Sequence, residues 1–273
     1  FVFFVILGAV IGFVLQIDFY FIMIIAIIFS LIYILISYYN SDKIALASVR
    51  AKPASNVAHK KFFDAAENMS LASGLPMPKL YVMESREINA FASGRDPQHA
   101  VVCFTTGALE KLDKQELEGV VAHEMSHIAN YDIRFMTLVA VLVGMISIAA
   151  EIFLRSLWFG GDRNNNKSGA ILIILGLIFA ILAPVAANLV SLAISRKREY
   201  TADATAVKFT RYPPGLAKAL TKIKHEHVPA DERHKYSKAT APLFISDPFK
   251  KKITGLFSTH PPIDERIRRL GKM

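Results

Sequence analysis

The sequence predicts an α+β membrane protein, in which four transmembrane helices accompany a mainly helical polar domain with a small β-sheet. Apolar residues make up 53% of the chain and the mean hydropathy is +0.35, and both values are high for a water-soluble enzyme. The apolar residues gather in four long blocks, and the sequence between and after the blocks shows helical and strand-like periodicity. The chain therefore divides into membrane parts and polar parts.

Residues 1–39 form a predicted transmembrane hairpin. Residues 1–17 and 19–39 carry no charge, and only Asp18 separates them. A span needs about 20 apolar residues, so the second run is long enough and the first is marginal. The chain begins at Phe1 without a methionine, which suggests a trimmed N-terminus. A cleaved signal peptide is the alternative for the first run, but no basic region or small-residue cleavage site supports it.

Residues 40–133 form the first polar part. An amphipathic helix is predicted at residues 56–72, and short strands are predicted at residues 80–83, 89–92 and 100–105. The single cysteine of the chain, Cys103, lies in the last of these strands. One cysteine excludes an intramolecular disulfide framework and fits a reducing compartment.

A further helix is predicted after the strands. Asp113 and Glu116 have the spacing of a capping box, in which each side chain bonds a backbone N–H at the start of a helix. Apolar residues then recur at helical spacing as far as Ile128. This pattern predicts a helix of about 17 residues.

The most informative motif of the chain lies on this helix, where residues 123–127 read HExxH. Histidines four residues apart share one helix face, so His123 and His127 can bind the same metal ion. Glu124 can then take a proton from a water bound to that ion. Two incidental surface histidines are the alternative, and the later motifs argue against it.

Residues 134–195 form the second predicted hairpin, with apolar runs at residues 135–159 and 170–195. Lys and Arg near the ends of spans predict the orientation, and they are more numerous beside the polar parts than in the loop of this hairpin. The polar parts therefore face the cytoplasm. This predicts a multi-pass protein of the plasma (inner) membrane with its catalytic domain in the cytoplasm.

Residues 196–273 form the second polar part and supply a third ligand. A hydrolytic zinc site has three protein ligands and one open position. The extended HExxHxxGxxH pattern is excluded, because Asn130 stands at the glycine and Ile133 at the third histidine. Glu199 and Asp203 lie four residues apart on a predicted helix face. Glu199 can bind the metal, and Asp203 can accept the free N–H of a ligating histidine, for which His123 is the candidate.

Both ligand-bearing helices are predicted to continue from membrane spans. His127 precedes the third span by eight residues, and Glu199 follows the fourth span by four. This places the metal near the membrane surface. Residues 225–227, His-Glu-His, also have ligand side chains, but their polar surroundings predict a solvated loop. Residues 229–252 are polar with scattered aromatics and are interpreted as a flap or a disordered loop.

The last motif is His260-Pro261-Pro262, which precedes a predicted helix at residues 263–270. A histidine held stiffly beside prolines near the metal can hydrogen-bond the oxyanion that forms when water attacks a peptide carbonyl. Arg266, one turn into the helix, can pair with a carboxylate of the site or with the substrate backbone.

Three motifs in this order resemble those of the HtpX-like membrane zinc metalloproteases, relatives of the endopeptidases that process CAAX prenylated proteins. They are HExxH at residues 123–127, Glu-Tyr-Thr-Ala-Asp at residues 199–203, and His-Pro-Pro at residues 260–262 with Arg266. The resemblance implies an endopeptidase with one Zn²⁺ per chain that cleaves damaged or misassembled membrane proteins in quality control and stress response. It also implies that an exposed edge strand binds the substrate through its main chain. That strand consists of Asn89, Ala90, Phe91 and Ala92.

The predicted partners are the lipid bilayer and polypeptide substrates. Residues 196–273 carry 18 Lys and Arg against 8 Asp and Glu, which favours anionic lipid headgroups. Nucleic acid is not a predicted partner, because no motif combines aromatic and basic residues. Two alternatives stay open: a narrow processing protease for a lipidated or membrane peptide, and a non-catalytic membrane scaffold with a structural zinc. An intact Glu124 argues against the scaffold, and the sequence leaves the oligomeric state open.

Overall fold

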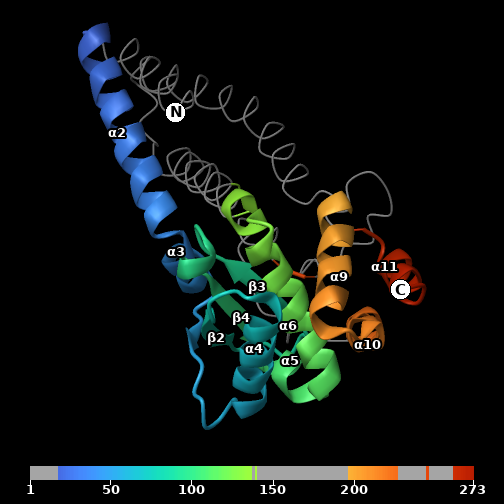
Figure 1. Ribbon diagram of the computed structural model, residues 1–273. Helices are drawn as coiled ribbons and strands as arrows, with labels where there is room; N and C mark the ends of the chain where they lie inside the picture. Colours follow the sequence, from blue (N-terminus) through green and yellow to red (C-terminus); the bar gives the residue numbers. More distant parts are fainter. Residues whose placement is uncertain (1–17, 137–138, 140–195, 227–243, 246–260) are drawn as a thin grey trace, which may run out of the picture.

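The computed structural model describes residues 18–136, 139, 196–226, 244–245 and 261–273 (Figure 1). The predicted first span, nearly all of the second hairpin and His260 lie outside the described residues. The helices are α2 (Phe19–Tyr39), α3 (Ser41–Ser48), α4 (Lys60–Ser73), α5 (Thr106–Lys111), α6 (Lys114–Ala129), α9 (Arg196–Thr210), α10 (Pro213–His225) and α11 (Ile263–Leu270). The strands are β1 (Lys52–Pro53), β2 (Lys79–Met83), β3 (Ala90–Ser93) and β4 (Val101–Thr105), with a short 3₁₀ helix at Pro97–His99.

The described strands form one mixed sheet in the order β1-β2-β4-β3. β2 runs parallel to β4, while β1 and β3 pair antiparallel with β2 and β4. β2, β3 and β4 lie within one residue of the predicted strands, and the mainly helical fold with a small sheet is confirmed. β1 was not predicted, because two residues, one of them Pro53, show no alternation.

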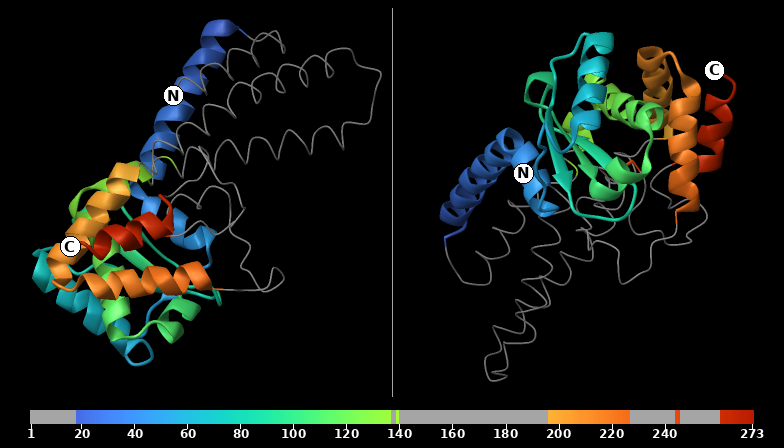
Figure 2. Two further views of the ribbon diagram at one scale, coloured as in Figure 1. Left: turned by 90° about the vertical axis from the view of Figure 1, so that its right-hand side faces the viewer. Right: turned by 90° about the horizontal axis from the view of Figure 1, so that it is seen from below.

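Apolar clusters cover both faces of the sheet, because successive residues of a strand point to opposite faces. In β4, Val102 and Phe104 join the cluster formed with α4 and α6, and the Phe104 ring lies 4.6 Å from that of Phe62. Val101 and Cys103 join the second cluster, to which α3 contributes. Beyond α6, the helices α9, α10 and α11 complete the polar domain (Figure 2).

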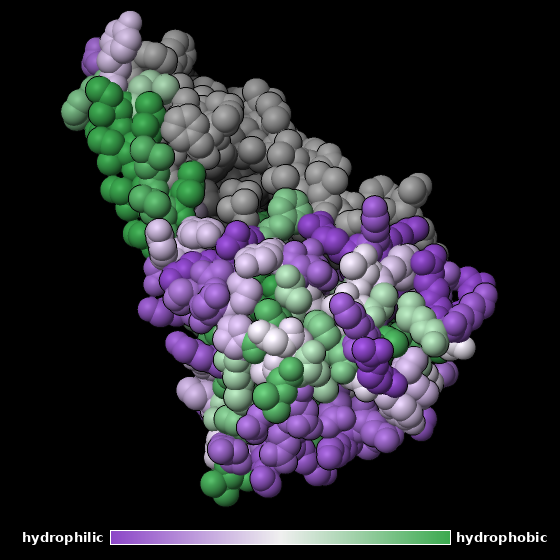
Figure 3. Space-filling model, viewed as in Figure 1, coloured by the Kyte–Doolittle hydropathy of each residue, from purple (hydrophilic) through white to green (hydrophobic). Residues whose placement is uncertain are grey.

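α2 is an apolar helix that projects from the polar domain (Figures 1 and 3). Asp18 caps its start by accepting the N–H of Phe21 at 2.9 Å, and roughly half of the surface of Ile24, Ile28 and Leu35 is exposed. Among the described residues, no single helix meets the length and apolarity needed to cross a bilayer. The two helical segments at residues 23–39 and 41–48 satisfy both requirements only when taken together, and the chain bends by 76° between them. The four-span arrangement therefore stays a prediction.

Two boundaries differ from the predictions. α6 ends at Ala129, and Tyr131 takes a φ of 57° before the chain becomes helical again at Asp132. A continuous α-helix excludes this left-handed conformation, so the predicted extension of this helix from the third span is interrupted at Tyr131. α4 begins at Lys60 rather than at residue 56, because residues 56–59 form turns in which the C=O of Ser55 accepts the N–H of His59 at 2.8 Å.

Glycines allow α6 to lie directly against α10. A Cβ added at Gly119 of α6 would come within 2.6 Å of the backbone nitrogen of Leu216, and a Cβ at Gly215 would come within 2.5 Å of the carbonyl oxygen of Gln115. Real Cβ atoms do not approach backbone atoms so closely. The two helix backbones are therefore in contact, and this contact fixes the position of the HExxH motif.

We expect Gly119→Ala to lower the free energy of unfolding by about 1–3 kcal/mol, because the added methyl forces the helices apart. Denaturation of the detergent-solubilised protein would measure the change. Gly271→Ala is the matched control, since its Cβ would meet the carbonyl oxygen of Ile267 at an ordinary 3.6 Å. Equal stability of the two variants would contradict the close helix contact.

Candidate metal centre

α6 carries His123, Glu124 and His127 into the interior of the polar domain. The helix begins with the predicted capping box, since Asp113 accepts the N–H of Glu116 at 2.9 Å and donates its own N–H to the Glu116 carboxylate at 2.8 Å. The three motif side chains are no more than 4% exposed. Polar groups at this depth need partners or a bound ion.

α9 places Glu199 opposite the two histidines. The Nε2 atoms of His123 and His127 lie 3.3 Å apart, and each lies 3.7 Å from an oxygen of Glu199. In a tetrahedral site with bonds of about 2.1 Å, the donor atoms are separated by about 3.4 Å. Two imidazoles and one carboxylate are thus gathered at a spacing that fits one metal ion.

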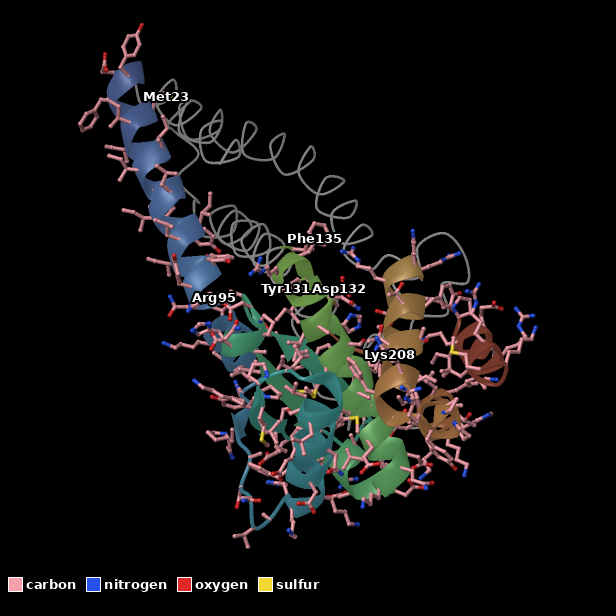
Figure 4. The ribbon with its side chains drawn as sticks, viewed as in Figure 1. Met23, Arg95, Tyr131, Asp132, Phe135 and Lys208 are labelled. Carbon is pink, nitrogen blue, oxygen red and sulfur yellow. The ribbon has the colours of Figure 1, made fainter. Side chains whose placement is uncertain are left out.

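Each of these histidines has a carboxylate at its other ring nitrogen. The Nδ1 of His123 lies 3.0 Å from Asp203, and the Nδ1 of His127 lies 3.0 Å from Asp132. A carboxylate accepts hydrogen bonds, so each Nδ1–H donates and each Nε2 keeps its lone pair for a metal. Figure 4 places Asp132 at the end of α6 that adjoins the grey trace.

Asp132 is a functional candidate that the sequence analysis missed. It stands five residues after His127 and beyond the turn at Tyr131, so helical spacing gives no reason to pair the two. A search for acidic residues within the first turn after the motif could have found it.

Arg266 binds the acidic side of the centre. It is fully buried, and its Nε and Nη2 donate to the two carboxylate oxygens of Asp203 at 2.9 and 2.7 Å. Its Nη1 lies 3.3 Å from Glu199. Of the two roles considered for Arg266, the structure shows the pairing with site carboxylates.

The electrostatics of the centre favour a cation. Burial raises the pKa of the Glu124 carboxyl to about 7, and the charge of Glu199 adds to the rise. Burial would also raise the pKa of Asp203, but the adjacent Arg266 lowers it to about 2. Three buried carboxyl groups, those of Glu124, Glu199 and Asp203, thus meet the single guanidinium that the structure describes at this centre. A bound cation would offset this excess of buried carboxyl groups.

The two histidines differ in their electrostatic surroundings. Burial lowers the pKa of His123, and its hydrogen bond to Asp203 offsets this only in part. Burial acts in the same direction on His127, but the hydrogen bond to Asp132 and the charge of Glu199 raise its pKa above the ordinary value.

The predicted substrate strand lies at the centre but is not exposed. β3 is the edge strand next to α6, and the backbone of Ala92 lies close enough to the Glu124 carboxyl to lower its pKa. However, Asn89, Ala90, Phe91 and Ala92 are at most 3% exposed. The prediction of an exposed edge is wrong, because Phe244 and Ile245 lie along this edge and cover it.

The prediction of a solvated loop at residues 225–227 holds only in part. His225 is exposed as predicted, but it is the last residue of α10 and not part of a loop. The side chain of Glu226 is only 6% exposed, and its carboxylate accepts the N–H of Ile88 at 2.8 Å and pairs with Lys111 at 2.7 Å. Glu226 therefore anchors the chain just before β3. His260 lies outside the described residues, while α11 begins after Pro262 as predicted.

Comparisons with known proteins agree with this geometry. The model of peptidase family M48 matches residues 58–273. A protein named protease HtpX homolog from Caldanaerobacter subterraneus subsp. tengcongensis is 48% identical over 251 residues, which cover 90% of this chain and 83% of that one. A protein of the same name from Thermoanaerobacter pseudethanolicus is 49% identical over 251 residues, which cover 90% of this chain and 83% of that one.

Among solved structures, the crystal structure of S. mikatae Ste24p matches with a TM-score of 0.51 and 17% identity. The match covers 98% of this chain but only 61% of Ste24p, so this chain spans less than two thirds of that protein's length. This likeness bears on the fold alone.

We expect Asp132→Asn to weaken metal affinity by about 10- to 100-fold, because the amide supports the His127 ring less strongly than a carboxylate does. Asp203→Asn should weaken affinity similarly and also lower stability, since it leaves Arg266 buried without its main counter-charge. Chelator competition and denaturation would measure the two effects. Asp64→Asn, on the surface of α4, is the control. Wild-type metal affinity in Asp132→Asn would remove Asp132 from the centre.

Proposed function

Since this chain belongs to peptidase family M48, we propose that it is a membrane-embedded zinc endopeptidase that hydrolyses damaged or misassembled membrane proteins on the cytoplasmic side. The observation that carries the proposal is the convergence of His123, His127 and Glu199 within 4.8 Å, with Glu124 buried beside them. Membership in the family makes the chain a metallopeptidase. The identity of the metal, the side of the membrane and the substrates are parts of the proposal.

His123, His127 and Glu199 would hold the zinc ion. Two neutral imidazoles and one carboxylate are a ligand set of catalytic zinc sites, which keep one position open. Bound there, zinc supplies Lewis acidity toward a peptide carbonyl and toward water. Asp203 and Asp132 keep the two imidazoles in the tautomer and orientation that this binding requires.

Glu124 is the proposed general acid and base. A carboxyl group whose pKa is about 7 can accept a proton from the attacking water and return it to the leaving amine at neutral pH. The backbone of Ala92, on β3, lies beside this carboxyl group and acts to lower its pKa. His260, proposed from the sequence to stabilise the oxyanion, and Arg266, which fixes Asp203 and Glu199, would complete the catalytic residues.

The membrane location is supported by α2 and by the proteins to which the chain is similar. α2 exposes aliphatic side chains over most of its length and ends at Tyr38 and Tyr39, residues of the type that gathers at membrane interfaces. The basic residues beside the predicted spans support a cytoplasmic polar domain. Quality control of membrane proteins follows from the HtpX-like resemblance.

We expect Glu124→Gln to keep one zinc ion per chain and to lose peptidase activity by a factor of about 10² or more, because only the proton acceptor is removed. Glu199→Ala should lose both metal and activity, because it removes a ligand. Elemental analysis and cleavage of an unfolded protein would separate the two variants. Glu110→Gln, exposed on α5, is the control. Full metal content in Glu199→Ala would exclude Glu199 as a ligand.

The proposed topology predicts a cytoplasmic location for a reporter fused after Met273 and the opposite side for one inserted near Asn165. The reason is that the two positions are separated by the predicted fourth span. Labelling of cysteine reporters in intact and permeabilised cells would locate each. Equal labelling of both positions from one side would contradict the four-span arrangement.

A further inference from the structure

A pocket lies along α9, on the face of this helix that is turned away from the metal centre. Its volume is about 590 Å³, and it is lined by residues of α9 from Lys197 to Lys208 and by Arg269 of α11, which lies beside α9 (Figures 1 and 2). With about 3.6 residues per turn, α9 carries Lys197 and Lys208 on the side opposite to Glu199 and Asp203. This α9 pocket is therefore separate from the metal centre.

The α9 pocket carries positive charge that no carboxylate of its lining balances. Lys197, Lys208 and Arg269 line it, and none of its lining residues is acidic. Both lysines are exposed, and neither forms an ion pair with another residue of the described part of the chain; Lys208 is labelled in Figure 4. Arg269 donates to Glu265 through its Nε at 2.9 Å, but this carboxylate also pairs with Arg268. An open pocket with unbalanced cations attracts an anion.

The donors of the α9 pocket suit an anion with several oxygens. The guanidinium of Arg269 lies over the Tyr200 ring, 3.7 Å from its centroid, and this contact and the bond to Glu265 hold it in place. Its Nη groups, the lysine ammonium groups and the hydroxyl of Thr205 are hydrogen-bond donors. A phosphate group offers three acceptor oxygens in a tetrahedral arrangement, so it can accept from both helices at once. The two oxygens of a carboxylate lie in one plane and fit such donors less well.

We propose that the α9 pocket binds a phosphate group, and that the bound group holds α11 against α9. Lys197 follows the predicted fourth span by two residues, so the pocket begins at the predicted membrane surface. A lipid headgroup and free phosphate share the chemistry that this pocket would recognise. The site goes beyond the proposed peptidase activity and does not require it.

A group bound in the α9 pocket would act on the metal centre through the two helices. Arg266 precedes Arg269 by three residues on α11, and its guanidinium is bonded to Asp203 of α9. An anion bonded to both helices opposes the separation of Arg266 from Asp203. Because Glu199 and Asp203 also lie on α9, metal binding depends on the same arrangement of the helices. Phosphate and metal should therefore strengthen each other's binding, and this coupling is reciprocal.

Thermal unfolding tests the binding site. The full chain with Glu124→Gln, which prevents hydrolysis, would be kept in dodecyl maltoside, a detergent without phosphate. We expect a higher unfolding temperature with inorganic phosphate than with acetate at equal ionic strength, or with phosphatidylglycerol added to the micelles, because a ligand of the folded state stabilises it. A rise with phosphatidylglycerol alone would identify a lipid headgroup as the source, and a rise with inorganic phosphate would show that free phosphate suffices.

Two double variants locate the effect. Lys208→Gln with Arg269→Gln should weaken the effective anion by about 10-fold or more, because it removes two charge-assisted donors. Lys218→Gln with Arg268→Gln removes the same charge from exposed positions outside the pocket and should keep the response. Lys208→Gln alone breaks no ion pair, so its weaker response would not reflect a folding defect. No rise in either arm, an equal rise with acetate, or an equal rise in the pocket variants would overturn the proposal.

Chelator competition tests the coupling. The effective anion should raise zinc affinity by about 5-fold or more, and it should not do so in the double variant of the pocket. Equal zinc affinity with and without the anion would overturn the role of the pocket in holding α11 against α9. Because Glu124→Gln removes the proton acceptor, both measurements give their result whether or not the protein is a peptidase.

Discussion

The buried ion pair between Arg266 and Asp203 is the interaction on which the rest of the centre depends. Burying either charge alone costs several kcal/mol, and the pair is tolerated because two hydrogen bonds join the guanidinium to both carboxylate oxygens. The pair ties α11 to α9 across 63 residues of sequence. It also holds Asp203 ionised beside His123, so the orientation of a metal ligand depends on a residue at the far end of the chain. α11 is thus a part of the metal centre.

The centre is held by different segments that restrain one another. The histidines come from α6, whose position is set by the backbone contact with α10 at Gly119. Their Nδ1 atoms are fixed from two directions, by Asp203 on α9 and by Asp132 beyond the turn at Tyr131. An imidazole bonded in this way cannot rotate without breaking a charge-assisted hydrogen bond. Metal affinity should therefore respond to any change that moves α9 relative to α6.

The features of this centre that the sequence predicts are those that depend on residues close together in the chain. The capping box of α6, the HExxH pattern and the start of α11 after Pro262 depend on a few adjacent residues, and all three are visible in the sequence. Asp132 was missed because the left-handed turn before it breaks the helical spacing. The cover on β3 was missed because pairing of Phe244 with Phe91 joins positions more than 150 residues apart in the sequence, and no periodicity records such a contact.

A metallopeptidase that binds its substrate through the main chain faces a problem of selectivity, because every polypeptide offers the same N–H and C=O groups. Discrimination must then come from side chains and from access to the edge of the strand. Phe244 and Ile245 lie along this edge, and their side chains pack in separate apolar clusters on the two faces of the sheet, around Phe91 and around Ala90. The carbonyl oxygen of Ala90 accepts the N–H of Ile245, so one main-chain group of the edge is already bonded within the chain.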